Sequence, residues 1–465
     1  MIRMLSQAAL QASGQAPLLS LLAGVIAIVL LLVVLNLPAF ISLALAGFTV
    51  AIVTPAISLA NAPGEFATAF GNGMGGIGIP ILMAAIIGKA MVESGSANRI
   101  VRAFNSLLGR DRTEFSLFGS SFFLAIPVFF DNVFYLLAPL ARSARSRRGH
   151  SYALFIVAVG AAASVAHGFV PPTPGPLLAV NEFGANLGMT ILIGLLVGLP
   201  TALVAGVGYG YFINQRLDIP LRDTMGSSVE DLEEQNEMDT NALPSVLESL
   251  LPVLLAVLLV TSNTVTQTLL GEDSAIAGIT GFLGDPNLAL TVAAMAAAAT
   301  FYRMSDFDSD EFSDELTQAL KSGGNIAAIT AAGGAFGAMI QAAGAGDFIA
   351  SSLEEVGLGL LVTAWLIAAG VRLVQGSATV SIVTTAGIMG PLASGLEVNL
   401  AYLVMAIGAG ASFCSWYNDS GFWIIKEIGG LTQAETVKTW TGATTILGIV
   451  GLLFTLMFST ILPLN

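Results

Sequence analysis

The polar residues that could bind a ligand gather at four points where long apolar segments are interrupted. These interruptions are Asp131-Asn132, His167–Pro176, Gln375–Thr379 and Ser415–Gly421. An α-helix cannot continue through the prolines of the second one, because proline lacks the amide hydrogen and clashes with the preceding turn. A helix that restarts after such a break presents free N–H groups and the positive end of its dipole, which favour an anion. The pattern therefore predicts a carboxylate ligand, with hydroxyl-bearing side chains nearby to recognise its hydroxyl groups.

These interruptions lie in a chain whose composition fits a lipid bilayer. The 465 residues are 55% hydrophobic and only 10% charged, with a mean hydropathy of +0.82. A soluble protein needs more polar residues, whereas a membrane-spanning helix needs about 20 apolar ones. Stretches of that kind include Leu18–Leu35, Asn186–Phe212 and Thr439–Leu462. We predict an all-α polytopic membrane protein, and we interpret the first stretch as a retained helix because it is too long for a signal peptide.

Charge and cysteine content argue against several other kinds of site. Much of the net charge of −14 falls in Glu230–Asp239 and Asp306–Glu315, which we interpret as solvated loops. The single cysteine, Cys414, excludes an intramolecular disulfide and a cysteine-rich metal site. The chain shows no nucleophile–base pair, metal cluster, nucleotide loop or nucleic-acid-binding pattern. We therefore expect no cofactor, no metal and no enzymatic activity.

The two halves of the sequence repeat each other at a nearly constant offset of 245 to 249 residues. The matched pairs are Gly88 and Gly95 with Gly337 and Gly344, Gly160–Ser164 with Gly408–Ser412, Asn181–Gly184 with Lys426–Gly429, and Pro38 with Pro286. An offset this constant over most of each half indicates a duplicated unit. We place the first repeat at 1–213, an acidic cytoplasmic linker at 214–244 and the second repeat at 245–465.

Basic residues set the expected orientation of the two repeats. The apolar segment Glu114–Leu140 is interrupted at Pro127 and Asp131-Asn132, and arginines flank it on both sides. Basic loops stay in the cytoplasm, and a segment this short cannot cross the bilayer twice. We therefore predict a re-entrant helical hairpin at 114–141 that enters from the cytoplasm. The matching hairpin at 358–393 has acidic flanks, which indicates entry from outside.

Placing the remaining segments around these hairpins gives two inverted repeats, each with five transmembrane helices and one re-entrant hairpin. The odd number of crossings inverts the second repeat relative to the first. All 17 basic residues except Arg3 and Arg372 then lie in the cytoplasm, and both termini lie outside. Broken helices are predicted at 151–185 and 400–428. The stretches 96–108 and 346–356 are predicted to be interfacial amphipathic arms, with plain connecting helices as the alternative.

Two titratable side chains in the first repeat could carry a proton. Asp131 lies at a hairpin tip inside the bilayer, where an isolated charge is costly, so it could bind a proton together with the anion. Its alternative role is to cap the second helix of the hairpin. His167 titrates near neutral pH, so it could pass protons or donate to the ligand, or else serve as a packing residue.

The second repeat adds a cation and further polar groups. Arg372 could clamp the ligand carboxylate or pair with Asp131 or Asp419, and pairing is favoured because a buried cation needs a counter-charge. Asp419 could also cap the helix that follows it. We assign ligand binding to residues of all four interruptions: Asn132, His167, Thr173, Arg372, Gly376, Ser377, Thr379, Asn418 and Ser420. Proton coupling is assigned to Asp131, His167 and Asp419.

Four motifs in order resemble the gluconate permease (GntP) family over essentially the whole chain. They are Phe129–Asp131, His167–Pro176, Arg372 with Gln375–Thr379, and Asn418–Trp423. The resemblance implies import of gluconate or a related sugar acid or hydroxy acid by proton symport across the bacterial inner membrane. It also implies the ion-transporter superfamily, with elevator-type scaffold and transport domains and usually a homodimer. Asn132 departs from the family pattern, which has an apolar residue there, and this puts the substrate and the coupling ion in doubt.

Other functions remain open at this point. A sodium-coupled carboxylate symporter is the nearest, because Asn132, Ser377, Thr379 and Asn418 offer oxygens of the kind that hold a hard cation. A passive channel could also be built from inverted repeats with hairpins. The sequence does not choose among gluconate, glycerate, a keto-deoxy acid and a small amino acid such as D-serine.

Overall fold

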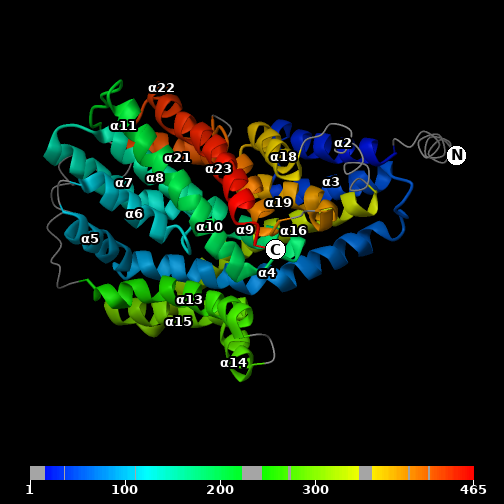
Figure 1. Cartoon of the computed structure of the whole chain (residues 1–465), viewed down its shortest axis with the longest axis horizontal. Helices are drawn as coiled ribbons and strands as arrows, with labels where there is room; N and C mark the ends of the chain where they lie inside the picture. The colour runs from blue at the N-terminus through cyan, green and yellow to red at the C-terminus, as the bar shows by residue number, and fades with distance from the viewer. Residues whose placement is uncertain are drawn as a thin grey trace.

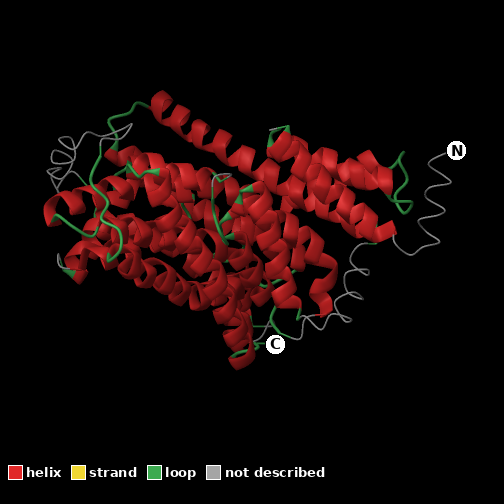
Figure 2. Cartoon of the chain, turned by 90° about the horizontal axis from the view of Figure 1, so that it is seen from above, coloured by secondary structure: helices red, strands yellow, loops and turns green. Residues whose placement is uncertain are grey.

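The computed structural model describes residues 16–35, 37–109, 112–222, 243–270, 274–344, 359–395, 398–416 and 419–464. All regular elements in these ranges are helices, which confirms the all-α prediction for the described chain (Figure 2). The first half consists of α2 (Ala16–Val29), α3 (Ala39–Val53), α4 (Ala62–Glu93), α5 (Ser96–Leu108), α6 (Thr113–Leu124), α7 (Phe130–Arg148), α8 (Tyr152–Phe169), α9 (Pro174–Phe183), α10 (Leu187–Ala202) and α11 (Tyr209–Asn214). The second half consists of α13 (Val246–Leu270), α14 (Ala275–Leu283), α15 (Pro286–Met304), α16 (Ser309–Ala342), α18 (Leu360–Gln375), α19 (Ala378–Met389), α20 (Ala401–Ala411), α21 (Ser420–Gly429), α22 (Gln433–Thr436) and α23 (Gly442–Ile461).

The two longest described helices are α4 and α16. α4 has 32 residues and α16 has 34, so each is about 50 Å long at 1.5 Å per residue. They pack against each other, and α15 packs on α4 while α3 packs on α16. Figure 1 shows α13 and α15 as a layer on the outer side of α4, with the helices that carry the four breaks on its other side.

The apolar helices are numerous enough for a polytopic membrane protein. Six helices of the described chain are long and apolar enough to cross a bilayer, or seven if the bent pair Ile276–Leu283 and Pro286–Met304 counts as one span. Other predicted crossings are shorter apolar helices, such as α2, α3 and α20. By length alone, the structure therefore supports six or seven of the ten predicted crossings.

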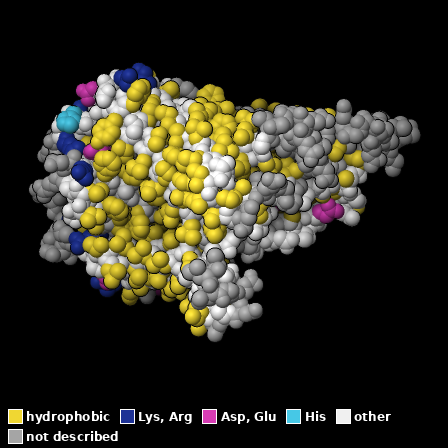
Figure 3. Space-filling view, in the orientation of Figure 1, with side chains coloured by type: hydrophobic (Ala, Val, Ile, Leu, Met, Phe, Trp, Pro, Cys, Tyr) yellow, Lys and Arg dark blue, Asp and Glu magenta, His cyan; other side chains and the backbone are white. Residues whose placement is uncertain are grey.

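The surface matches a protein embedded in lipid. Hydrophobic side chains cover most of the described part of the face shown in Figure 3, and lysines and arginines gather at its left end. Figure 1, drawn in the same orientation, places α7 and α11 at that end. A basic end beside a broad apolar face is the distribution expected where one end of a membrane protein lies in the cytoplasm.

One acidic stretch is helical, contrary to the sequence interpretation. Asp306–Glu315 was expected to be a solvated loop, but α16 begins within it at Ser309. The Asp308 side chain accepts from the backbone of Glu311, and the Glu311 side chain accepts from the backbone of Asp308. This reciprocal capping box starts the helix, and acidic side chains in its first turn favour the positive end of the dipole. The other stretch, Glu230–Asp239, lies outside the described residues.

The remaining boundaries differ from expectation in small ways. α5 has the bounds predicted for the first amphipathic arm, whereas 346–356 lies outside the described residues. α7 continues past the predicted hairpin end at residue 141 to Arg148. The predicted linker is described only at its two ends, and Arg222 there donates to both carboxylate oxygens of Glu435 at 2.8 and 2.9 Å. This ion pair ties the end of the first half to α22.

α16 and α19 approach each other backbone to backbone, which yields a stability prediction. A β-carbon on Gly337 would lie 2.3 Å from the Cα of Gly387, so neither helix can make room without moving apart. Gly337→Ala is expected to destabilise the protein by about 1–3 kcal/mol, the usual cost of overpacking. The measurement is thermal unfolding of the detergent-solubilised protein.

Gly324→Ala is the matched control for this variant, because its β-carbon would have no atom within 4 Å on the same helix α16. It should leave the melting temperature unchanged or slightly higher, since alanine favours a helix more than glycine does. Equal melting temperatures for the two variants would contradict the close approach.

Candidate functional site

Four half-helices begin at a single cavity. The cavity has a volume of 390 Å³, and the first residues of α7, α9, α19 and α21 all line it. The residues in its wall are Ala39, Phe129, Phe130, Asp131, Ser164, His167, Gly168, Pro174, Ile326, Ile329, Arg372, Ser377, Ala378, Thr379, Val380, Asp419, Ser420, Gly421 and Trp440. α7 packs against α21 and α9 against α19. Because the helix N-termini converge, their positive dipole ends add in one place.

The local sequence explains why each half-helix begins there. α9 starts with Pro174, whose fixed backbone suits a first helical position. Ser377 caps α19 by accepting from the Val380 amide at 3.3 Å, and Asp419 caps α21 by accepting from the Gly421 amide at 3.0 Å. α7 and α9 have no side-chain cap. Their first-turn amides are therefore not capped by side chains of their own and remain suited to an anion.

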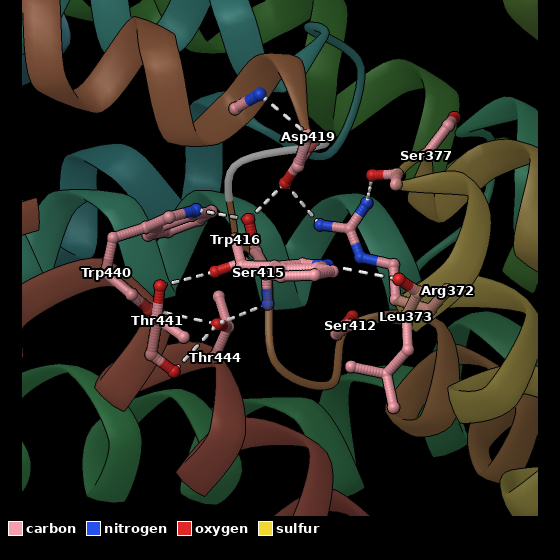
Figure 4. Close-up of polar contacts among 12 residues, drawn as sticks. Arg372, Leu373, Ser377, Ser412, Ser415, Trp416, Asp419, Trp440, Thr441 and Thr444 are labelled. Carbon is pink, nitrogen blue, oxygen red and sulfur yellow. Dashed lines mark hydrogen bonds and ion pairs between the residues drawn. The ribbon is translucent and has the colours of Figure 1, made fainter. Parts of the chain in front are cut away.

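A buried ion pair joins the tip of the second hairpin to the second broken helix. Arg372 is only 4% exposed, and its guanidinium donates to the Asp419 carboxylate and to the Gly376 carbonyl. The Ser415 hydroxyl donates to the same carboxylate and accepts from the Trp440 indole N–H at 2.6 Å. Figure 4 shows Arg372 and Ser415 meeting at Asp419 from opposite sides. Of the two partners expected for Arg372, the structure supplies Asp419.

Asp131 lies in the same wall but in a different setting. It occupies the first turn of α7, one position after Phe130, and no described residue forms an ion pair or hydrogen bond with its carboxylate. It does not cap α7, because the N-cap position is Phe129. The carboxylate is therefore available to a proton or to a cation in the cavity.

His167 also faces the cavity, and no described residue is a polar partner of its ring. It lies in the last turn of α8, and its ring meets the Phe129 ring edge-on at 6.3 Å between centroids. Its Nδ1 atom is buried and has no hydrogen-bond partner among the described residues. Buried polar atoms normally find a partner, so an orphaned nitrogen at a cavity wall suits contact with a ligand or water.

Most of the predicted site residues lie together in the structure, and a few lie elsewhere. Seven of them line the cavity: Asp131, His167, Arg372, Ser377, Thr379, Asp419 and Ser420. Thr173 is buried, and its hydroxyl donates to the Val170 carbonyl at 2.9 Å, so it holds the break between α8 and α9 instead of facing the cavity. Gly376 takes part through its carbonyl, which accepts from Arg372. Asn418 lies outside the described residues.

Asn132 lines a second cavity of 440 Å³ instead of the first. Lys89 and Glu93 of α4 and Gln318 of α16 share that cavity. Phe129 belongs to the walls of both cavities, so this residue lies between them. Asp131 and Asn132 are successive helical residues and point about 100° apart, which explains why they face different spaces.

Sequence reasoning missed several residues of the wall. Ser164 lies three residues before His167 on α8 and shares its face, so helical spacing could have identified it. Ile326 and Ile329 of α16 and Trp440 before α23 come from segments without a polar interruption, and no local signal marks them. They add to the apolar part of the wall, which also includes Phe129, Phe130 and Val380.

An all-helical fold with several apolar spans and a polar cavity at its helix breaks defines a multi-pass membrane transporter. In fold alone, the chain is similar to the YdaH transporter of Alcanivorax borkumensis, with a TM-score of 0.60, 14% identity and coverage of 92% of this chain and 98% of that one. The chain belongs to the GntP family of permeases, whose sequence pattern matches residues 16–461. It is therefore a permease and not an enzyme, and a multi-pass protein of the bacterial inner membrane.

Relatives within the family are similar over nearly their whole length. The chain is 37% identical to a gluconate permease of Pseudomonas aeruginosa, over 86% of this chain and 88% of that protein. It is 30% identical to the high-affinity gluconate transporter of Escherichia coli, over 96% of this chain and 100% of that protein. The family resemblance predicted from four short motifs is thus confirmed across the chain.

Proposed function

We propose that the protein imports gluconate or a closely related sugar acid across the inner membrane together with protons. The observation that carries the proposal is the meeting of four helix N-termini at a cavity that also holds Arg372, Ser377 and Thr379. Helix N-termini and a guanidinium favour a carboxylate, and hydroxyl side chains can bond the hydroxyl groups of a polyol chain. A volume of 390 Å³ lies in the range of small-molecule sites. The named function of the relatives points to the same substrate.

Asp131 is the proposed carrier of a coupling proton. Asp419 is committed to Arg372, whereas Asp131 has no partner among the described residues. A second free negative charge would repel the bound anion, so a neutral Asp131 fits the loaded cavity better. Proton and anion then enter the cavity together, and His167 is placed to donate to the anion or pass the proton.

The proposed movement follows from the paired arrangement of the two halves. The pair α6 and α8 corresponds to α18 and α20, and α4 with α15 corresponds to α16 with α3; each of these pairs is in contact. These correspondences support two structural repeats at 1–213 and 245–465, and we propose that they are inverted relative to each other. We propose that the hairpins and broken helices form a transport domain that moves as an elevator against a scaffold containing α4 and α16. A homodimer stays a prediction from the family.

The test of the proposed function is uptake into proteoliposomes. With an imposed pH gradient and no sodium, labelled gluconate should accumulate above its outside concentration. Accumulation only with a sodium gradient would replace the proposal by the sodium-coupled alternative, and equilibration without accumulation would indicate a channel. Competition by gluconate, glycerate, a keto-deoxy acid and D-serine then ranks the substrates.

The proposed topology makes a separate prediction at the basic end of the molecule. Ser146, exposed in the last turns of α7, is expected to lie in the cytoplasm. In a Cys414→Ala background, a cysteine replacing Ser146 should react with a membrane-impermeant maleimide only in inside-out vesicles. A cysteine replacing Ser58, exposed between α3 and α4, is the control and should react only in intact cells. The reverse pattern would overturn the topology.

A further inference from the structure

Glu182 is an acidic side chain that lies outside the candidate site described above. It lies in the last turn of α9, half-buried between α16 and the end of α19. Its Oε1 atom is 3.3 Å from the position that a β-carbon would take on Gly390, and its Oε2 atom is 3.8 Å from that of Gly334. A β-carbon at position 390 would crowd the carboxylate, whereas one at position 334 would make ordinary contact with it. The neighbouring Asn181 contacts α4 in the same way at Gly76, so this turn of α9 fits closely between the two long helices.

No described residue neutralises the charge of Glu182. α9 packs against α4, α8, α10, α16, α19, α20 and the short helix Gly390–Gly395. Of these, α10, α19, α20 and Gly390–Gly395 contain no charged residue. The nearest basic residue of α16, Lys321, is 13 positions before Gly334, or about 20 Å along the helix. On α4, Lys89 is 13 positions after Gly76, and Glu65 is 11 positions before it. His167 of α8 lies beside the opposite end of α9, where the cavity is.

The local helix adds to the cost of a charge at this position. The last turn of a helix carries the negative end of the dipole, which opposes a carboxylate. An acidic residue held within a membrane protein without a counter-ion is rare, and such residues mark proton and substrate pathways. Protonation of Glu182 removes both the cost of a charge without a counter-ion and the unfavourable interaction with the helix dipole.

The matching acidic residue in the second half has a counter-ion. Glu427 is the counterpart of Glu182, and it forms an ion pair with the adjacent Lys426 at 2.5 Å, with 48% of its side chain exposed. In the first half, Asn181 stands where the lysine would be. The two halves therefore present the same acid once with a cation and once without one.

We propose that Glu182 binds a second transported proton, separate from the proton at Asp131. The inference rests on the proposed function and extends it. Glu182 lies on the same half-helix whose first residue, Pro174, lines the anion cavity, about 12 Å away at 1.5 Å per residue. The carboxylate takes up a proton on the outer side, forming an O–H bond, and releases it on the cytoplasmic side. With two protons and one monovalent anion, each cycle moves one net positive charge inward.

The net charge moved in each transport cycle can be measured in an experiment. In proteoliposomes with no pH gradient and an inside-negative potential of about 59 mV, one transported charge is worth a tenfold concentration ratio. The wild-type protein should accumulate gluconate about tenfold, whereas Glu182→Gln should show no accumulation. With a pH gradient of one unit and no potential, the expected ratios are about 100-fold for the wild type and tenfold for Glu182→Gln.

Two further variants are controls, one for the folding of the protein and one for the matching acid of the second repeat. Glu427→Gln should accumulate gluconate as the wild type does, and Glu182→Asp should retain the potential-driven tenfold ratio. Counterflow exchange of gluconate, which needs no gradient, should persist in Glu182→Gln. Its loss in both Glu182 variants would assign Glu182 a structural role and overturn the inference.

Other outcomes distinguish this inference from the proposed function. If a pH gradient drives uptake but a potential alone does not, Glu182 carries no second proton and the one-proton symport stands. The same holds if Glu182→Gln responds to the potential as the wild type does. If neither gradient drives uptake by the wild type, the proposed function itself fails and the inference fails with it.

Discussion

Replacing Asp131 by Asn is expected to remove the part of the pH dependence of gluconate binding that comes from Asp131. In the wild-type cavity, the anion binds together with a protonated Asp131, so proton binding and anion binding are linked. As the pH rises and Asp131 loses its proton, this residue alone should lower the affinity by at most tenfold per pH unit. The amide of the variant resembles the protonated acid in shape and charge. Its affinity should therefore fall less steeply with rising pH than that of the wild type, and any dependence that remains belongs to other groups such as Glu182.

Isothermal titration of the detergent-solubilised protein with gluconate between about pH 5 and pH 9 measures this directly. Asn132→Ala is the matched control, since Asn132 is the next residue on α7 but faces the second cavity. It should keep the wild-type dependence on pH. An unchanged pH dependence in Asp131→Asn would remove Asp131 from the coupling role and leave His167 as the remaining candidate in the cavity.

The sequence was sufficient to locate the breaks that build the site, because each break has a local cause. Prolines end α8, and the polar tip at Gln375–Thr379 contains Gly376, whose backbone φ of +87° is one that few other residues adopt. The sequence of the capping box at Asp308 and Glu311 also predicts a helix start. The acidic composition of the stretch was instead interpreted as a loop. Local rules therefore explain where the helices begin and end.

The directions of side chains could not be read in the same way. Asp131 and Asn132 are adjacent in sequence, yet they face different cavities, which only the packing of α7 against its neighbours decides. Arg372 and Asp419 are 47 residues apart, and the sequence left Asp131 as an equal partner. Trp440 reaches the site through Ser415, from a segment with no motif of its own. Such contacts depend on tertiary packing.

Breaking the ion pair between Arg372 and Asp419 is expected to have the largest effect on stability. Both side chains are buried, at 4% and 6% exposure, and removing one leaves an uncompensated charge inside the protein. Arg372→Met and Asp419→Leu should each destabilise the protein by about 3–5 kcal/mol. Thermal unfolding in detergent measures the loss, and Lys426→Met is the control, because it breaks an ion pair with the half-exposed Glu427 that should contribute at most about 1 kcal/mol.

The double variant Arg372→Met/Asp419→Leu separates the structural role of the pair from a role in binding. With both charges gone, the cost of an unpaired charge disappears, so most of the stability should return. Gluconate binding should stay at least tenfold weaker than in the wild type, because the cavity loses its guanidinium while the helix N-termini remain. Recovery of wild-type affinity would show that Arg372 serves only to hold Asp419, and that the four helix N-termini are sufficient to bind the carboxylate.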